Sequence, residues 1–364
     1  MKKLKAIKFR AKVKGNGIVN YDGDQKQLVL NHKFDTLIIP KKKDNSYVDS
    51  VNFAKKALYK NVETDEVDYR IKISSDCMRK AIFSEDEHIN PAIVNSDSLF
   101  SVFTLSPVGL LRGYFNTDRN AAETGFSYSS SSPVTVTAAI QVPDEDGNLA
   151  KSYIEACNSS GTRTDNSFFN RENVGDICYE FEGRIDIKKL QFISADPVFD
   201  RIGIKSDWVT SGLAQSRIKA HYGEDADFKC GIFSSSVKNI GKAYCEHGIL
   251  LGHNVQEKLI RYFFEHLINA RIDRARAYAE VTDVEVAPVY DILEESEWVS
   301  VDNASFLNDE YYTFYEECSD DELCERTKMI EKHKEQENLR RDEKQAEREE
   351  KKARAAKKAA EANQ

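Results

Sequence analysis

The opening residues of the chain alternate apolar and cationic side chains over the length of one strand. Apolar residues such as Phe9, Ala11 and Val13 alternate with Lys and Arg between residues 3 and 15. A period of two places successive side chains on opposite faces, so the pattern predicts a β-strand with one buried and one cationic face. The turn signal Gly15-Asn16-Gly17 ends it. A cationic strand face is either a solvated surface or a binding surface, and the pattern leaves both open.

The net charge of −9 over 364 residues comes from one short block. Residues 291–325 hold 13 acidic residues and neither Lys nor Arg, whereas residues 326–364 hold 13 basic and 9 acidic residues. The remaining residues, 1–290, carry 39 residues of each sign and are neutral. A neutral body can still carry a local basic groove, so the overall acidity does not exclude nucleic acid as a partner.

The order of predicted elements favours an α+β fold. Capping residues before Cys77 predict a short helix over residues 77–83, and helical spacing predicts a long helix over residues 254–271, ending at its Arg271. Strand patterns are found at residues 134–142, at 179–192 as a strand pair, and at 277–286. A central antiparallel sheet with two helices on one face, ferredoxin-like or RRM-like, fits this order if large insertions such as residues 20–61 are allowed. The charged residues after about Thr327 predict a C-terminal helix or a disordered tail.

Several classes of protein are disfavoured by what the sequence lacks. No apolar run approaches the roughly 20 residues of a membrane helix, and no secretory signal is visible. The seven cysteines have no paired spacing, so we expect a reducing cytoplasm. Cys230, Cys245 and His247 lie near one another, as do Cys318 and Cys324, but without zinc-site spacing. We expect no metal, no cofactor and no catalytic residues, because phosphate-loop, nucleophile-elbow and kinase motifs are also missing.

Basic residues next to aromatic rings are the most informative pattern in the chain. They occur in three places: Arg112 with Tyr114 and Phe115; Arg163 with Phe168 and Phe169; and Arg271, Arg274 and Arg276 with Tyr278. Single-stranded nucleic acid is bound by this combination, because cations hold phosphates and flat rings stack on bases. Each patch alone is more often surface charge above core aromatics. The Gly15-Asn16-Gly17 turn could also let a nucleic-acid backbone approach closely.

These features occur in an ordered set of motifs that resembles a known family. The motifs lie at residues 15–20, 31–32, 73–83, 110–114, 165–169, 175–176, 190–201 and 274–278. In order and content they resemble the Cas-seven family of RAMP-type backbone subunits of class 1 CRISPR effector complexes. The likeness is closest to the type I-F variant or type IV. It covers residues 1 to about 287, and the acidic segment 288–325 and the tail 326–364 have no counterpart in the compact members.

The resemblance implies a hand-shaped subunit on a modified RRM core that stacks head to tail into a filament along guide RNA (crRNA). It implies no catalysis by this subunit, target DNA or RNA paired to the guide, and other effector subunits: a guide-processing endonuclease, a cap at the five-prime end, and a large subunit or helicase. Arg79 and Lys80 match the family's basic helix, Arg112 its Arg-Gly turn, and Ser167 to Phe169 its polar-aromatic loop. The full set of expected RNA contacts is Asn16, Asn20, Lys41, Lys42, Lys43, Arg79, Lys80, Arg112, Tyr114, Arg163, Ser167, Phe168, Phe169, Arg274 and Arg276.

Two other functions remain open at this point. A backbone subunit that cleaves target RNA would use an Asp and a metal ion, and Asp22, Asp24 or Asp44 could be proposed for that role. A scaffold protein that polymerises without RNA, with the tail as its coupling arm, is the other alternative.

Overall fold

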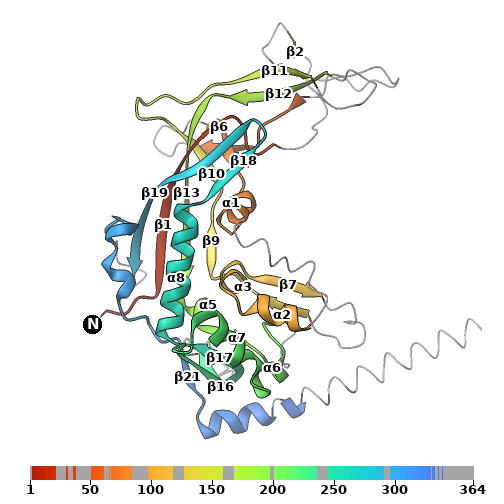
Figure 1. Ribbon diagram of the computed structural model, residues 1–364, viewed down its shortest axis with the longest axis vertical. Coiled ribbons are helices and arrows are strands. Elements are labelled where there is room, and N and C mark those ends of the chain that lie inside the picture. Colours follow the sequence, from red (N-terminus) through yellow and green to blue (C-terminus); the bar gives the residue numbers. More distant parts are fainter. Residues whose placement is uncertain are drawn as a thin grey trace, which may run out of the picture.

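The structure is a computed structural model. It describes residues 2–21, 30–31, 36–37, 51–60, 65, 67–83, 97–117, 127–158, 168–196, 201–235, 245–290, 296–328, 330–332, 335 and 338. The fold mixes antiparallel sheets with several helices (Figure 1). None of the helices in these ranges is long and apolar enough to cross a membrane.

A nine-stranded sheet organises the molecule around β1 (Ala6–Asn16), the strand predicted from the opening alternation. β1 pairs antiparallel with β13 (Asp176–Asp186) on one side and with β19 (Ala277–Val289) on the other. Beyond β13 lie β10 (Ala139–Val142), β6 (Val67–Ile73) and β5 (Lys56–Lys60), and beyond β19 lies β18 (Arg271–Arg274). Two short strands pair off this path, namely β9 (Val134–Val136) with β13 and β20 (Val299–Ser300) with β19.

The inward face of β1 packs under the long helix α8 (His253–Ile268), which runs alongside β1 and β13 in Figure 1. Phe9 is fully buried, and its ring centroid lies 5.2 Å from that of Phe263 and 6.3 Å from that of Phe264. The shorter helix α1 (Ser75–Ile82) packs beside α8, and Phe83 at its end contacts Phe263. The two helices therefore share one core with the sheet.

The outward face of β1 is cationic as predicted, and three of its four cations form ion pairs, whereas Lys8 is exposed without one in the described chain. Arg10 pairs with Glu285, Lys12 with Asp283 at 3.6 Å, and Lys14 with Glu145 at 3.1 Å. Two of these partners lie on the neighbouring strand β19, where cross-strand pairs of opposite charge meet directly. From Arg10 to Lys14, the cationic face of β1 is thus a solvated ladder of ion pairs.

The turn after β1 needs glycine at two positions because other parts of the protein's own backbone approach it closely. Gly17 has a φ of +76°, and a side chain there would lie 2.8 Å from the carbonyl oxygen of Arg276. At Gly15 a side chain would lie 2.4 Å from the carbonyl oxygen of Tyr278. The close approach that these glycines permit is to β19 and its preceding turn.

Two of the predicted elements end differently from expectation. α8 ends at Ile268, and Arg271 to Arg274 form β18, so these arginines lie on a strand and not at a helix terminus. The strand pattern predicted at 179–192 is confirmed only as far as Asp186, where β13 ends, and its second half is wrong. There the Asp186 carboxylate accepts a hydrogen bond from the backbone N–H of Lys189 and caps a short helix, α5 (Ile187–Gln191).

Three smaller sheets surround the large one, and a two-stranded sheet, β2 (Leu30–Asn31) with β3 (Thr36–Leu37), is also present. The first contains β11 (Ser152–Asn158), β12 (Phe168–Val174) and β4 (Val51–Asn52). The second contains β15 (Arg201–Ile202), β8 (Ser127–Ser130) and β7 (Tyr114–Thr117). It packs with the helices α2 (Asp97–Thr104), α3 (Pro107–Arg112), α6 (Ser206–Thr210) and α7 (Leu213–Tyr222).

The third small sheet brings the C-terminal segment back onto the body. Its order is β14 (Phe192–Ser194), β17 (Cys245–Leu251), β16 (Phe228–Ser235) and β21 (Tyr315–Glu317). Leu307, Tyr311 and Phe314 of the acidic segment are buried in the core, next to the 3-10 turns Val301–Asn303 and Ser305–Asn308. Residues 320–328 then form a helix, and the described positions from 330 to 338 are also helical. Of the two predictions for the tail, helix or disorder, the described positions from 326 to 338 are consistent with the helix.

His221 on α7 gives the fold a testable pH dependence. Burial lowers the pKa of His221 from its ordinary value, and the nearby Arg217 lowers it further, although the ring contacts the Val102 carbonyl at 3.0 Å. The unfolded chain, with an ordinary pKa of about 6.5 at this position, therefore takes up a proton before the folded chain does. We expect the free energy of unfolding to fall as the pH drops below about 6.5. His221→Gln should reduce this loss in urea titrations, and an identical pH profile in the variant would contradict the prediction.

Candidate nucleic-acid interface

The strongest candidate site is formed by two arginines from neighbouring helices. Met78, Ala81 and Ile82 form the buried side of α1, which leaves Arg79 half-buried and Lys80 exposed. Arg112 is exposed at the C-terminal end of α3, where Gly113 with a φ of +72° ends the helix. The Arg79 guanidinium donates a hydrogen bond to the backbone carbonyl of Arg112. Two sequence motifs that lie 33 residues apart are thereby brought into contact.

The electrostatics of this pair favour an anion. Burial lowers the pKa of Arg79 below its usual value, and the like charge of Arg112 lowers it further, with Asp76 offsetting only the smallest part. Among the residues that the structure describes, neither arginine forms an ion pair with a carboxylate. Two neighbouring guanidinium groups repel each other, and a phosphate bound between them would relieve that repulsion through charge-assisted hydrogen bonds.

Asn20 and Arg274 connect this pair to the edge of the large sheet. The Asn20 side-chain amide donates to the hydroxyl of Ser74, the N-cap residue of α1, at 3.0 Å. Next to it in the chain, the carbonyl oxygen of Val19 accepts a hydrogen bond of 3.4 Å from the Arg274 guanidinium. α1 also packs against β18, which carries Arg274 (Figure 1). We call the set Asn20, Arg79, Lys80, Arg112 and Arg274 the helix-edge surface.

Asn16 and Arg276 lie beside this surface. Asn16 is exposed at the end of β1, and its side-chain amide donates to the Asp176 carboxylate at 2.9 Å. Arg276 is exposed in the turn between β18 and β19, against which Gly17 packs. Both residues lie at the same end of the sheet.

The chain matches a family model described as Type I-Fv CRISPR-associated protein Cas7fv-like, over residues 3–311. The chain belongs to this family. Membership identifies a Cas7-type backbone subunit of a type I CRISPR complex and decides between the two branches left open by the sequence, in favour of the type I-F variant. No match was found among curated proteins. The match extends further than the predicted boundary near residue 287 and includes most of the acidic segment.

Tyr114 has to be corrected as an RNA contact of this Cas7fv-like protein. Its side chain is only 8% exposed, its hydroxyl donates to the carbonyl of Gly203, and burial raises its pKa. A nucleotide base cannot stack on a ring in that position. The adjacent Phe115 is 62% exposed instead, because successive side chains of β7 point to opposite faces. The predicted patch named both rings, and strand alternation was the signal that one of them had to face inward.

Other predicted contacts of this family member fall outside what the structure describes. Lys41, Lys42, Lys43, Arg163 and Ser167 are among them, as are Asp22, Asp24 and Asp44 of the catalytic alternative. Phe168 and Phe169 begin β12, and their backbones pair with β11, but their side chains lie outside the described part. Arg271, part of the third basic-aromatic patch, pairs with Asp273 and Glu280 while stacking on Tyr278.

Proposed function

We propose that this Cas7fv-like subunit grips guide RNA by its phosphates along the helix-edge surface. The observation that carries the proposal is a difference in charge pairing. Arg10, Lys12 and Lys14 on β1 are matched by carboxylates, whereas Arg79, which bonds to the backbone of Arg112, and Arg112 itself have no ion pair in the described chain. An exposed cation that already has a carboxylate partner has less to gain from a phosphate, so the unmatched pair is the better binding site.

The central topology supports an RRM-like core for the proposed function. The strands β19, β1, β13 and β10 lie side by side in that order and are antiparallel. In the chain, α1 lies between β1 and β10, and α8 lies between β13 and β19. We infer from this order a βαββαβ core of the ferredoxin-like type with large insertions. We propose that those insertions extend the core into the hand-like shape of the family.

The open face of this sheet differs from an RNA-binding RRM face in its chemistry. An RRM stacks bases on aromatic side chains of the sheet surface. Here that face carries the ion pairs of β1, and Trp298 covers Arg10 with 4.7 Å between the guanidinium carbon and the ring centroid. We therefore place the RNA at the helix-edge surface, with Phe115 available for stacking.

The proposed role is to hold RNA and not to cut it. Phosphate contacts position the guide without reading its sequence, and base pairing between guide and target supplies the specificity. Head-to-tail stacking of identical subunits would produce an open filament along the guide. We expect no cleavage when assembled complex is incubated with matched RNA and Mg²⁺. Periodic cuts would support the metal-dependent alternative and overturn this part of the proposal.

Purification of the protein with and without co-expressed guide RNA tests the proposed function as a whole. We expect large particles with a high ratio of absorbance at 260 nm to that at 280 nm when the guide is present, and their dissociation after RNase treatment. A polymer that forms without nucleic acid would contradict the proposal and favour the scaffold alternative.

Phe115 provides a test of stacking at the proposed surface. Phe115→Ala is expected to weaken RNA binding by roughly tenfold, because stacking of a base on an aromatic ring contributes about 1–3 kcal/mol. The free energy of unfolding should change by less than about 0.5 kcal/mol, since the ring is exposed. Phe115→Leu, which keeps apolar area without a flat ring, should bind RNA as weakly as the alanine variant. Full affinity for RNA in both variants would show that Phe115 is not part of the RNA-binding surface.

A further inference from the structure

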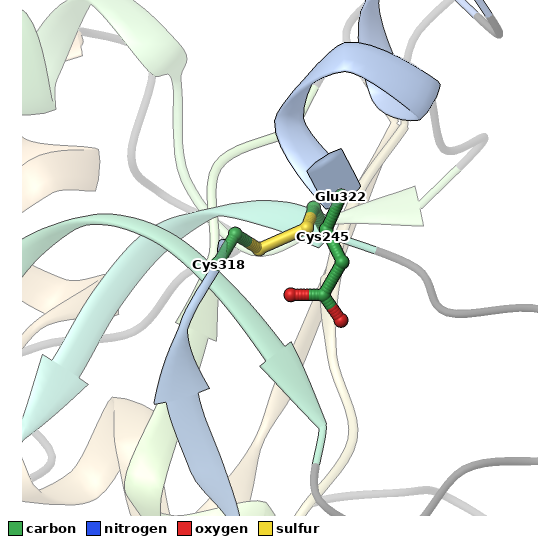
Figure 2. Close-up of side chains that lie close together, drawn as sticks. All are labelled: Cys245, Cys318 and Glu322. Carbon is green, nitrogen blue, oxygen red and sulfur yellow. A yellow bond between two sulfur atoms is a disulfide. The ribbon is translucent and has the colours of Figure 1, made fainter. Parts of the chain in front are cut away.

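Two cysteines and a glutamate meet where the C-terminal segment joins the body (Figure 2). Cys245 is the first residue of β17, and Cys318 follows β21 directly. Their Cα atoms are 6.2 Å apart, and they form a disulfide across 73 residues of sequence. Glu322 comes from the first turn of the helix 320–328, with its carboxylate beside the two sulfurs. One potential ligand atom from each of the three residues lies within 4.8 Å of the others.

The backbone holds these three residues together independently of the bond between the sulfurs. The backbone N–H of Cys318 donates to the carbonyl of Ile232 on β16 at 3.2 Å, and the same strand pairs with β17. Glu322 is held by a capping box in which its carboxylate accepts hydrogen bonds from the N–H and hydroxyl of Ser319, at 2.9 and 3.0 Å. Reduction of the disulfide would therefore leave the side chains close to one another.

Arg326 fastens the same helix to the body. Its guanidinium pairs with Asp196, which is 1% exposed, and also donates to the carbonyl oxygen of Cys245 at 3.2 Å. The helix that carries Glu322 is thus tied to the strand that carries Cys245 by a contact that involves no sulfur. This arrangement preorganises the cluster for a ligand that bridges its members.

We propose that, when the disulfide is reduced, Cys245, Cys318 and Glu322 bind a zinc-class divalent cation. Two thiolates and a carboxylate form a three-ligand set of the kind that leaves one position for water in tetrahedral zinc sites. Sulfur ligands select zinc-class ions over Mg²⁺ and Ca²⁺, which prefer oxygen. Three neighbouring negative groups repel one another, and a divalent cation offsets that repulsion. The site would join the C-terminal segment to β17 as the disulfide does.

The two states interconvert by a balanced reaction. A phosphine reductant supplies two electrons to the disulfide, the S–S bond breaks, and two thiols form with two protons. The phosphine becomes a phosphine oxide by taking its oxygen from water. The thiols then release two protons as they bind the divalent cation as thiolates.

Titration of the reduced full-length protein with Co²⁺, used as a spectroscopic substitute for Zn²⁺, tests the proposal. We expect one Co²⁺ per chain, a sulfur-to-metal charge-transfer absorption, and displacement of Co²⁺ by Zn²⁺. The oxidised protein should lack this absorption. Reduced protein without the absorption would overturn the proposal, as would a disulfide that resists reduction in the folded protein.

Variants identify the ligands. Cys318→Ser should abolish the charge-transfer absorption, and Glu322→Gln should weaken Co²⁺ binding by roughly tenfold or more. The exposed Cys230 and Cys324 provide matched controls, because Cys230→Ser and Cys324→Ser should leave both absorption and affinity unchanged. An absorption that survives in Cys318→Ser would place the metal elsewhere. Should Cys318→Ser fail to fold, unchanged affinity in Glu322→Gln would contradict the site.

Discussion

Replacing Arg79 and Arg112 together with alanine is expected to weaken binding of single-stranded RNA by roughly 100-fold or more at low salt. The estimate follows from about 1.5–3 kcal/mol for each charge-assisted hydrogen bond to a phosphate. The slope of log affinity against log salt should also fall by about two, because each arginine that neutralises a phosphate contributes about one to that slope. Both effects should be independent of the RNA sequence. Filter binding or fluorescence anisotropy over a salt series measures them.

Lys12→Ala with Lys14→Ala provides the matched control for that experiment. Like the arginine variant, it removes two positive charges, but from β1, where Lys12 pairs with Asp283 and Lys14 with Glu145. We expect RNA affinity and salt slope close to those of the unmodified protein. Arg79→Lys with Arg112→Lys should largely retain the salt slope, because it keeps the charges while removing the planar groups. Equal losses in the β1 control and the arginine variant would show that only net charge matters.

Phe9→Ala is expected to be the most destabilising single change in the body, at about 3–5 kcal/mol. The Phe9 ring is fully buried against Phe181, Phe263 and Phe264 and covers Gly183, the residue opposite it on β13. A side chain at Gly183 would lie 2.1 Å from the end of the Phe9 ring, so the ring fills the space that the glycine leaves. Its removal would leave a cavity between the sheet and α8, which urea unfolding would detect.

Leu58→Ala on the edge strand β5 is the matched apolar control. Leu58 is 64% exposed, so its truncation should change the free energy of unfolding by less than about 0.5 kcal/mol. A loss at Leu58 comparable with that at Phe9 would indicate that the edge of the sheet is covered in solution. A small loss at Phe9 would contradict the packing of α8 on β1.

Local patterns predicted the elements that carry a strong period of their own. The alternation before Gly15 predicted β1 with its buried and cationic faces, and helical spacing predicted α8 to within three residues of its C-terminal end. The short helix after Ser74 was also predicted to within two residues of each end. For β1 and α8, the spacing of apolar residues records which side faces the core, whereas the short helix was predicted from its capping residues.

Features that depend on partners distant in sequence could not be predicted in this way. The ladder of ion pairs on β1 depends on Asp283 and Glu285, which lie on a strand about 270 residues later. Arg271 belongs to β18 because that strand pairs with β19, although helical spacing carried the expected helix to that residue. Cys245 and Cys318 come together through β16, so their sequence spacing contains no sign of the cluster.

The helix-edge surface could be predicted from the sequence only in part. Its arginines belong to sequence motifs, but only the fold shows that Arg79 contacts the end of α3 and that Asn20 contacts the residue before α1. Strand alternation could have separated Phe115 from Tyr114 in the sequence, since neighbouring residues of a strand face opposite sides. The ion pairs of Arg10, Lys12 and Lys14 favour the solvated of the two interpretations left open for that part of β1.

Photo-crosslinking of guide RNA to the assembled protein, followed by mass spectrometry of the linked peptides, tests the central claim most directly. The account predicts crosslinks in α1, in the segment from Arg112 to Phe115, and in the turn between β18 and β19. Crosslinks concentrated on the outward face of β1 and its neighbours β13 and β19, with none at α1 or α3, would contradict it.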